Sequence, residues 1–409
     1  MKYCLIGGKL GHSFSKVIHQ SCGLDYDLVE LAEAQLEAFV RSGDYDGYNV
    51  TIPYKKAILP YLDEIDEGAR LAGAVNTVVA KNGKLYGYNT DVLGFEQMVK
   101  SSGITLSKRR VLVLGSGGAS GAVQAVCKAQ GASSVVVVSR TGEVNYDNVY
   151  ATCADAEVII NSTPVGMYPD DGCPIDVDRF DGLVAVFDCV YNPIRTKLVL
   201  NARSKGLVAC GGLKMLLGQA FEAQKIWGVY DGVKAENTAK NLVNHKNNLV
   251  LSGMPGCGKS TIGRLAAEAL GLDYVDTDDE ILRRTTKTAQ EIILSDGEAA
   301  FRDIESAVVY DLSRTAGKVI ALGGGAVLRP ENVRAVEANG IIVYIQRDVS
   351  LLATENRPLS QAQGVQALFD GRRAVYESTA DGMVINDGDI ADVAQEVIDL
   401  YENLSYQRS

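Results

Sequence analysis

The sequence of 409 residues has fewer basic than acidic side chains, with 40 lysines and arginines against 51 aspartates and glutamates. Its formal net charge is -11 and its isoelectric point is near 5.0. Nucleic acids and anionic membranes attract basic surfaces, so neither is expected as the main partner of this chain. Small anionic substrates would need local basic pockets.

Long apolar runs are also missing. No stretch approaches the roughly 18 consecutive apolar residues that a membrane helix requires. The opening segment MKYCLIGG has no cationic stretch followed by a long apolar one. We therefore expect neither membrane insertion nor export.

Cysteine pairs and histidine clusters are absent as well. The eight cysteines lie singly between Cys4 and Cys257 without a CxxC pair, and the three histidines form no cluster with zinc-ligand spacing. A reduced, cytoplasmic protein is the simplest interpretation. Disorder is not expected, because 46% of the residues are hydrophobic and 22% are charged.

Short β-branched runs alternate with helical patterns along most of the chain, which is typical of α/β folds with mainly parallel sheets. Expected strands include YCLI near the start and residues 111 to 115, 135 to 139 and 248 to 253. The polar segment at residues 241 to 248 is rich in asparagine and is the expected linker between two halves. A weaker boundary is expected near residues 101 to 110.

Residues 253 to 260, GMPGCGKS, match the phosphate-binding pattern GxxxxGK[ST] between an expected strand and an expected helix. A glycine turn without function is the alternative. In the functional reading, Lys259 reaches the β and γ phosphates and the Ser260 hydroxyl ligates magnesium. This half is therefore expected to bind ATP or GTP with Mg²⁺. The residues expected to contact the nucleotide are Gly253, Gly256, Gly258, Lys259, Ser260 and Thr261.

Several motifs accompany this loop: DTDDEI contributes Asp276 and Asp278, FRDIE contributes Arg302, LGGGAV contributes three glycines and NRPL contributes Arg357. Each has a plain alternative when taken alone, because Asp278 could cap a helix, the glycines could form a turn and Arg302 could be a solvated charge. At these spacings, the combined set resembles the shikimate kinase family over residues 248 to 405.

This resemblance implies a P-loop kinase domain at residues 249 to 409 that phosphorylates shikimate. Arg302, helped by Arg372, would bind the substrate carboxylate with paired hydrogen bonds. Asp278 would hold the attacking hydroxyl in line with the γ phosphate. The glycines that would let backbone amides approach the ring are Gly323, Gly324 and Gly325.

The same resemblance implies that Asp276 is an outer-sphere partner of magnesium. It also implies that Arg357 belongs to a lid that closes over the γ phosphate. The segment from Arg347 to Arg357 is shorter than the family's lid and has no second arginine where one usually stacks on adenine. Arg372 is chosen over its neighbour Arg373 by its distance of four residues from Tyr376. We expect nucleotide affinity to be lower than in the family.

The first half has many small polar side chains beside apolar strands, in the segments HSFS, NVTIPYK, AVNT and NTD. Periodicity does not explain this density, but a binding site does. Together with NSTPVGM, VYNP and GGLKMLLGQA, these segments resemble the shikimate dehydrogenase family over roughly residues 1 to 240. The resemblance implies a substrate lobe at residues 1 to 100, completed by residues 212 to 240, and a Rossmann-like NADP lobe at residues 101 to 211.

Reduction of a ketone leaves an oxygen that must gain a proton, so the site needs an acid within hydrogen-bonding reach. Lys55 is the candidate, and the resemblance pairs it with Asp91, although a lone lysine would ordinarily be a surface residue. The resemblance also implies that Ser13, Ser15 and Tyr191 bind the substrate carboxylate. The residues that it assigns to the ring hydroxyls are Thr51, Asn76 and Gln219.

The expected cofactor loop is GSGGAS at residues 115 to 120, in which Ser120 replaces the third glycine of GxGxxG. The next strand ends in VSRT, where an NAD enzyme would carry an acidic residue, so Arg140 favours the 2′-phosphate of NADP. An ordinary surface arginine is the alternative. The remaining expected cofactor residues are Gly115, Gly117, Gly118, Ala119, Ser139, Thr141, Gly212 and Met215.

The cofactor lobe departs from its family in one respect. No second basic residue follows Thr141 closely, and the interval before the strand EVIINS lacks the helix and strand that the family usually fits there. The adenosine side of the pocket is therefore expected to be truncated.

Both resemblances imply an enzyme that acts on shikimate, which is the product of the first reaction and the substrate of the second. The expected function is reduction of 3-dehydroshikimate to shikimate with NADPH, followed by phosphorylation of shikimate with ATP. Two alternatives stay open at this point: a quinate or mixed dehydrogenase that uses NAD, and a half that binds ligand without catalysing a reaction. The sequence makes no prediction of the oligomeric state.

Overall fold

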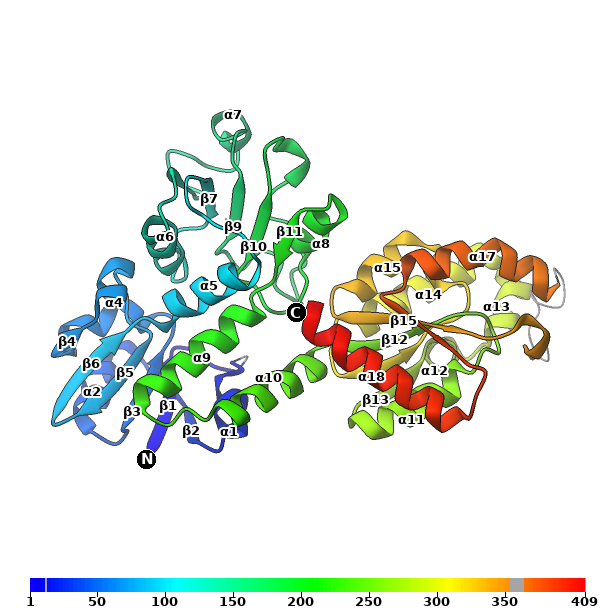
Figure 1. Ribbon diagram of the computed structural model, residues 1–409, viewed down its shortest axis with the longest axis horizontal. Helices are drawn as coiled ribbons and strands as arrows, with labels where there is room; N and C mark the ends of the chain where they lie inside the picture. The colour runs from blue at the N-terminus through cyan, green and yellow to red at the C-terminus, as the bar shows by residue number, and fades with distance from the viewer. Residues whose placement is uncertain (12, 353–363, 409) are drawn as a thin grey trace. The chain divides into compact units, whose positions relative to one another are not determined.

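The computed structural model describes residues 1–11, 13–352 and 364–408 (Figure 1). Contacts between residues divide the chain into two compact units, Met1–Ala239 and Lys240–Ser409. The division falls beside the expected linker at residues 241 to 248. Most of that segment is nevertheless helical, because α10 (Gly232–Lys246) continues through it. The buried side chains of Leu242 and Val243 give this otherwise polar stretch an apolar side.

The first sheet of the first unit is mixed and has the strand order β2-β1-β3-β5-β6-β4. β1 pairs in parallel with β2 and β3, whereas β5 pairs antiparallel with β3 and β6. Its strands are β1 (Lys2–Gly7), β2 (Asp25–Glu30), β3 (Gly47–Val50), β4 (Glu64–Ile65), β5 (Thr77–Lys81) and β6 (Lys84–Tyr88). The helices connecting them are α1 (Ser15–Ser21), η1 (Glu33–Gln35), α2 (Leu36–Ser42), α3 (Tyr54–Ala57), η2 (Leu59–Tyr61) and α4 (Glu67–Ala72).

The second sheet of this unit is parallel, with the strand order β11-β10-β9-β7-β8. Apolar clusters cover both of its faces, which explains why its strands are almost continuously apolar in sequence. Its strands are β7 (Arg110–Leu114), β8 (Ser134–Val138), β9 (Val158–Asn161), β10 (Ala185–Asp188) and β11 (Val208–Cys210). The helices are α6 (Ser120–Ala129), α7 (Val149–Thr152), η3 (Val177–Arg179) and α8 (Lys197–Ser204).

Two long helices join the two sheets of the first unit (Figure 1). α5 (Thr90–Ser101) leads from the first sheet to the second, and α9 (Leu213–Trp227) returns. The helices pack closely where a Cβ atom on Gly94 would lie 2.6 Å from the Met215 carbonyl oxygen. At the end of α9, Trp227 Nε1 donates to the Val78 carbonyl oxygen at 2.9 Å, which anchors the returning helix on β5.

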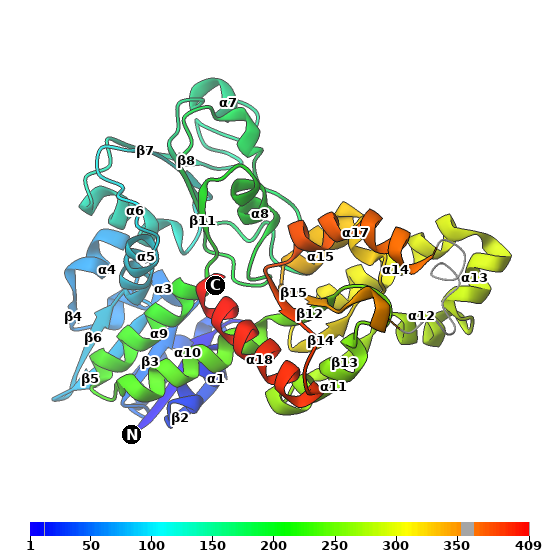
Figure 2. The same ribbon diagram turned by 45° about the vertical axis from the view of Figure 1, so that its right-hand side comes forward.

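The second unit has one parallel sheet with the strand order β13-β14-β12-β15-β16. Helices cover both faces of this sheet (Figure 2). Its strands are β12 (Asn248–Ser252), β13 (Asp273–Asp276), β14 (Lys318–Ala321), β15 (Gly340–Gln346) and β16 (Gly382–Ile385). Its helices are α11 (Lys259–Leu270), α12 (Thr277–Thr285), α13 (Ala289–Asp296), α14 (Glu298–Ser313), η4 (Ala326–Leu328), α15 (Pro330–Glu337), η5 (Val349–Leu351), α17 (Val365–Thr379) and α18 (Ile390–Arg408).

The expected α/β class is confirmed, and each of the four strands named from the sequence lies at its expected place to within one residue. The interval after β8 is as short as the sequence indicates. Of the described residues between β8 and β9, only those of α7 form a regular helix, and β8 is left at the edge of its sheet. Within the described ranges, no helix is long and apolar enough to cross a membrane.

Candidate active sites

Lys55 and Asp91 form a close ion pair in the first unit. The distance from Lys55 Nζ to Asp91 Oδ2 is 2.5 Å, and the two side chains are 17% and 12% exposed. Asp91 lies in the first turn of α5, which Asn89 caps by accepting a hydrogen bond from the Asp91 backbone nitrogen at 3.1 Å. Asn89 is itself fixed, because its side chain donates to the Ala74 carbonyl oxygen at 2.8 Å. The pair is thus a shielded, oriented ammonium and carboxylate.

Asn76 lies just before β5 and is buried. Its amide oxygen accepts hydrogen bonds from the Thr90 backbone nitrogen at 2.7 Å and from the Thr77 and Thr90 hydroxyls at 3.1 Å. These hydrogen bonds fix the orientation of the Asn76 side chain. Thr51 follows β3, and the preceding residue, Val50, donates its backbone N–H to the Asn76 carbonyl oxygen at 2.8 Å.

The segment that carries Ser13 and Ser15 lies beside Tyr191. The rings of Phe14 and Tyr191 meet edge to face with centroids 5.5 Å apart. Ser13 Oγ accepts a hydrogen bond from the Ser15 backbone nitrogen at 3.2 Å, and burial raises the pKa of the Tyr191 hydroxyl. Gln219 lies on α9, where its backbone nitrogen would be 2.9 Å from a Cβ atom on Gly94, one turn beyond Asp91 in α5.

A buried carboxylate that the sequence reasoning missed holds the Tyr191 loop. Asp188 ends β10 and accepts hydrogen bonds from the Val190 backbone nitrogen at 2.9 Å, the Asn161 side chain at 2.9 Å and the Thr196 hydroxyl at 2.6 Å. Burial raises the pKa of Asp188 to about 6, against the lowering effect of these three donors. An acidic residue at the end of the apolar strand VAVFD was the available signal.

The glycine-rich turn after β7 borders a cavity of about 530 Å³ that also contains Lys55. Gly117 and Gly118 line this cavity, and a Cβ atom on Gly117 would meet nothing within 4 Å. Ala119 is the N-cap residue of α6. An open turn at a helix N-terminus can accept a pyrophosphate, so the residues present fit a dinucleotide.

The residues after β8 form a compact turn, in which the Ser139 backbone nitrogen donates to the Val144 carbonyl oxygen at 3.2 Å. Arg140 and Thr141 are exposed on this turn. Gly212 is the N-cap residue of α9, and Met215 is buried in the core, with 6% of its surface exposed. The cofactor roles of these residues remain predictions.

The phosphate loop of the second unit joins β12 to α11. Lys259 is buried, and its Nζ atom donates to the carbonyl oxygens of Gly253 at 2.9 Å and Met254 at 3.0 Å. Gly258 has a φ of 105°, and a Cβ atom there would lie 2.5 Å from Asn386 Nδ2, so only glycine fits. Thr261 is exposed in the first turn of α11, where Gly253 and Gly256 complete the loop before it.

Asp276 ends β13 and connects the loop to α12. Its carboxylate accepts hydrogen bonds from the Ser260 hydroxyl at 3.0 Å, the Tyr274 hydroxyl at 3.2 Å and the Asp278 backbone nitrogen at 3.0 Å. Asp276 is therefore the N-cap residue of α12. Helix capping, the alternative role for Asp278, is thus performed by Asp276. Burial and the negative charges of Asp276 and Glu305 raise the pKa of Asp278 to about 6.

Arg302 lies on α14 opposite Asp278. Its guanidinium donates to Glu305 at 2.7 Å and to Glu298 at 3.2 Å. Glu305 is 1% exposed, and its second oxygen, Oε1, is buried without a hydrogen-bond partner. The three glycines pass directly beside this pair, because a Cβ atom on Gly325 would lie 2.4 Å from both terminal nitrogens of Arg302.

Arg372 on α17 completes the wall by donating to the Gly324 carbonyl oxygen at 3.1 Å. The Tyr376 hydroxyl donates to the same oxygen. Arg372 was preferred over Arg373 because it lies four residues before Tyr376. Arg372 and Tyr376 do donate to the same carbonyl oxygen, whereas Arg373 is exposed. Arg357 lies outside the described residues.

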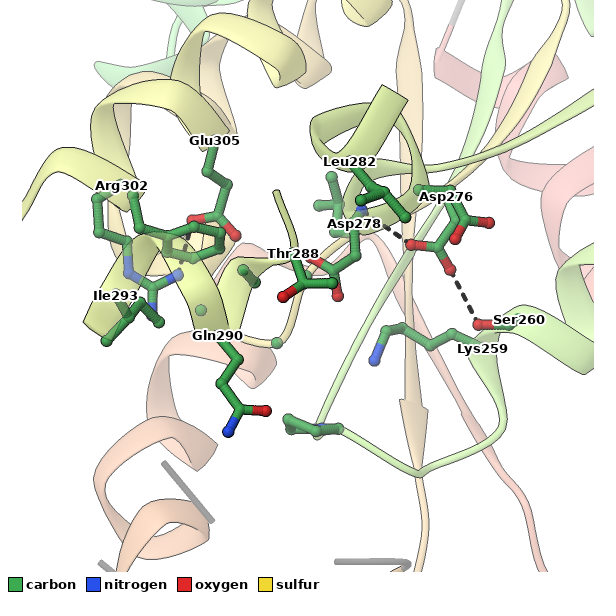
Figure 3. Close-up of a pocket in the computed structure, with 18 of the residues that line it drawn as sticks. Lys259, Ser260, Asp276, Asp278, Leu282, Thr288, Gln290, Ile293, Arg302 and Glu305 are labelled. Atoms are coloured by element: carbon green, nitrogen blue, oxygen red, sulfur yellow. Dashed lines mark hydrogen bonds and ion pairs between the residues drawn. The ribbon is translucent and has the colours of Figure 1, made fainter. Parts of the chain in front are cut away.

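These groups surround one cavity of about 620 Å³ (Figure 3). In Figure 3, Lys259 and Asp278 lie near each other, and Arg302 with Glu305 lies across from them. Sequence reasoning did not assign the rest of the wall, to which α12, α13 and α14 contribute further side chains. The additional wall residues are Leu282, Thr288, Ala289, Gln290, Ile293 and Phe301.

The Ser260 and Asp276 side chains suit a magnesium ion that arrives with a nucleotide. Within the part of the chain that the structure describes, no group of three or more His, Cys, Asp and Glu side chains is placed to hold a metal. Magnesium bound to a nucleotide usually takes one or two protein ligands besides phosphates and water. The hydroxyl and carboxylate next to Lys259 meet that requirement.

Comparison with known proteins places each half in a family. The model of the shikimate dehydrogenase substrate binding domain matches residues 5–78, and that of shikimate kinase matches residues 255–402. The NADP(+) shikimate dehydrogenase of Clostridium beijerinckii is 36% identical over an alignment of 247 residues, and the match covers 55% of this chain and 91% of the relative.

Solved structures match the first part of the chain. A chorismate mutase/shikimate 5-dehydrogenase fusion protein from Clostridium acetobutylicum is 35% identical, with a TM-score of 0.55, covering 59% of this chain and 96% of that one. Shikimate 5-dehydrogenase of Thermus thermophilus in complex with shikimate is 30% identical, with a TM-score of 0.52, covering 59% and 98%. The chain therefore belongs to the shikimate dehydrogenase family and carries a shikimate kinase domain behind it, as a fusion of the two enzymes.

Proposed function

We propose that the chain catalyses two consecutive reactions, reduction of 3-dehydroshikimate to shikimate with NADPH and phosphorylation of shikimate with ATP. The observation that carries the proposal is that the shielded Lys55–Asp91 pair and the Asp278–Arg302 cavity each meet the chemical needs of one step. The product of the first reaction is the substrate of the second. The domains are assigned as residues 1–100 with 212–240, 101–211 and 249–409.

In the first reaction, the bound cofactor would supply a hydride to the substrate carbonyl carbon. Lys55 donates a proton to the carbonyl oxygen, and Asp91 orients the Lys55 side chain while it accepts a hydrogen bond from a ring hydroxyl. Ser13, Ser15 and Tyr191 bind the carboxylate. The side chains left for the ring hydroxyls are Thr51, Asn76 and Gln219.

In the second reaction, Asp278 accepts a hydrogen bond from the attacking hydroxyl and holds it in line with the γ phosphate. Lys259 leaves the two loop carbonyls and stabilises charge on the β and γ phosphates. Arg302 and Arg372 bind the substrate carboxylate. Ser260 and Asp276 would hold the magnesium ion, which neutralises phosphate charge during transfer.

The eight free cysteines support a reducing, cytoplasmic compartment. The net charge of -11 supports small molecules, and not nucleic acids or membranes, as the partners.

Arg140 is proposed to select NADPH over NADH. Replacing it with methionine removes the cation expected beside the 2′-phosphate, so KM for NADPH should rise about tenfold while KM for NADH changes little. Initial rates of 3-dehydroshikimate reduction with NADPH and with NADH measure this preference. Oxidation of shikimate and of quinate with NADP+ and with NAD+ compares the two substrates. Arg179→Met, which alters an exposed arginine on the same lobe, is the matched control. An unchanged NADPH to NADH ratio in Arg140→Met would assign selectivity elsewhere and reopen the NAD alternative.

The kinase reaction is expected to lose activity in acid. Because burial and neighbouring carboxylates raise the pKa of Asp278 to about 6, the accepting carboxylate exists above that pH and is protonated below it. The value of kcat/KM for shikimate should therefore fall about tenfold per pH unit below this pKa. The dehydrogenase activity of the same samples reports whether the protein stays folded. A midpoint near the ordinary aspartate value of about 3.9 would contradict this assignment.

Gly325 is proposed to leave room for the Arg302 guanidinium. In Gly325→Ala the added methyl group would lie 2.4 Å from both terminal nitrogens, so the arginine must shift away from the substrate carboxylate. KM for shikimate should rise by at least about tenfold, with KM for ATP nearly unchanged. Gly371→Ala is the control, because a Cβ atom there meets nothing within 4 Å. Equal shikimate KM values in the two variants would show that Arg302 does not need this space.

A further inference from the structure

Tyr274 on β13 is half-buried and directs its hydroxyl at the Asp276 carboxylate. The hydroxyl donates to Asp276 Oδ2 at 3.2 Å. The Ser260 hydroxyl, which Figure 3 shows joined to Asp276, donates to the same oxygen at 3.0 Å. An ionised carboxylate only accepts hydrogen bonds, so both hydroxyls are donors. The tyrosine hydroxyl has no role in the reactions proposed above.

The Tyr274 ring lies along one face of α11. Ser260, Gly263 and Arg264 lie three and four residues apart at the start of this helix and therefore share that face. A Cβ atom on Gly263 would lie 2.7 Å from Tyr274 Cε2, so the ring rests directly on the helix backbone. The Arg264 guanidinium covers the ring at 4.6 Å from its centroid. The ring is thus held in place, and its hydroxyl points along the helix toward Ser260.

The donors that hold the Asp276 carboxylate are neutral. They are the hydroxyls of Ser260 and Tyr274 and the backbone nitrogen of Asp278. Arg264, the cation that covers the tyrosine ring, pairs with Asp279 at 3.9 Å instead. Neutral donors orient a carboxylate without cancelling its charge, so the negative charge of Asp276 remains available to attract a cation.

The geometry of a magnesium site gives this orientation a purpose. A serine hydroxyl that offers a lone pair to a metal still has one proton to donate, and Asp276 Oδ2 already accepts the proton of Ser260. Magnesium demands a nearly ideal octahedral arrangement, so its ligand must be aimed accurately. A group that fixes the carboxylate therefore also fixes the direction of the Ser260 lone pairs.

We propose that Tyr274 is a positioning residue for the magnesium ion that accompanies the nucleotide. Its hydroxyl fixes the Asp276 carboxylate, and the carboxylate holds the proton of Ser260, the expected metal ligand. Tyr274 acts through these two residues and contacts neither the nucleotide nor shikimate. The proposal rests on the kinase function proposed above.

Binding of ADP to the full chain, with saturating magnesium chloride or with EDTA, tests this proposal by isothermal titration calorimetry. Magnesium should tighten ADP binding to the unaltered protein. Tyr274→Phe keeps the ring and removes the hydroxyl, so Kd for ADP with magnesium should rise about tenfold, while Kd with EDTA changes less than about twofold. Tyr406→Phe, which alters an exposed tyrosine on α18, is the matched control and should bind like the unaltered protein.

Shikimate phosphorylation provides a second readout. The magnesium concentration for half-maximal rate should rise in Tyr274→Phe, whereas KM for shikimate should not change. Equal Kd values for ADP with magnesium in Tyr274→Phe and the unaltered protein would overturn the proposal. Equal weakening with magnesium and with EDTA would also overturn it, because the hydroxyl would then act on the phosphate loop and not on the metal. An unaltered protein that binds ADP under neither condition would instead overturn the proposed kinase function.

Discussion

Lys55→Met is expected to lower kcat/KM for reduction of 3-dehydroshikimate by about a thousandfold, the range in which a positioned general acid contributes. The reason is geometric: the Lys55 Nζ atom lies 2.5 Å from Asp91 Oδ2 in a largely shielded pair that faces the cavity of the glycine-rich turn. Methionine has a similar side-chain length but lacks the ammonium group that donates the proton. Loss of NADPH absorbance during turnover measures the effect.

Lys100→Met is the matched control, since Lys100 is exposed near the end of α5 and is not assigned to the site. Shikimate phosphorylation by the Lys55→Met protein should equal that of the unaltered chain, because the kinase residues lie in the other unit. A Lys55→Met enzyme that retains even a tenth of its reductase activity would exclude lysine as the proton donor.

Asp278→Asn is expected to lower kcat for shikimate phosphorylation by about a hundredfold to ten-thousandfold. The amide keeps the shape of the carboxylate but lacks its charge, so it accepts a hydrogen bond from the attacking hydroxyl only weakly. The acid limb of the pH profile, which the pKa of about 6 for Asp278 produces in the unaltered chain, should also disappear. Formation of ADP in the presence of shikimate is the measurement.

Asp392→Asn on α18 controls for the loss of one exposed carboxylate from the same unit. Binding of ATP should be retained in Asp278→Asn, because Lys259 and the glycine loop are unaltered. Loss of ATP binding together with activity would place Asp278 in the nucleotide site and contradict its role as acceptor of the hydroxyl hydrogen bond.

The local motifs could be predicted from the sequence because each performs its chemistry within a few residues. The loop at residues 253 to 260 needs only a strand before it and a helix after it, and the structure has both. Lys55 and Asp91 are distant in sequence, yet the resemblance paired them, and the structure brings them into contact. The choice of Arg372 rested on helical spacing, which α17 obeys.

Features that depend on tertiary packing could not be predicted. Residues 241 to 246 look like a polar linker, but burial of Leu242 and Val243 keeps them in α10. Asp188 has no motif of its own and becomes recognisable only when Val190, Asn161 and Thr196 converge on it.

One assay of the purified chain with 3-dehydroshikimate, NADPH and ATP tests whether a single protein catalyses both reactions. NADPH oxidation and ADP formation should both occur, and shikimate 3-phosphate should accumulate in the same amount as each. Omitting NADPH should stop both signals, whereas added shikimate should restore ADP formation alone. A chain that oxidises no NADPH, or that forms no ADP when shikimate is supplied, would contradict the assignment of two activities to one protein.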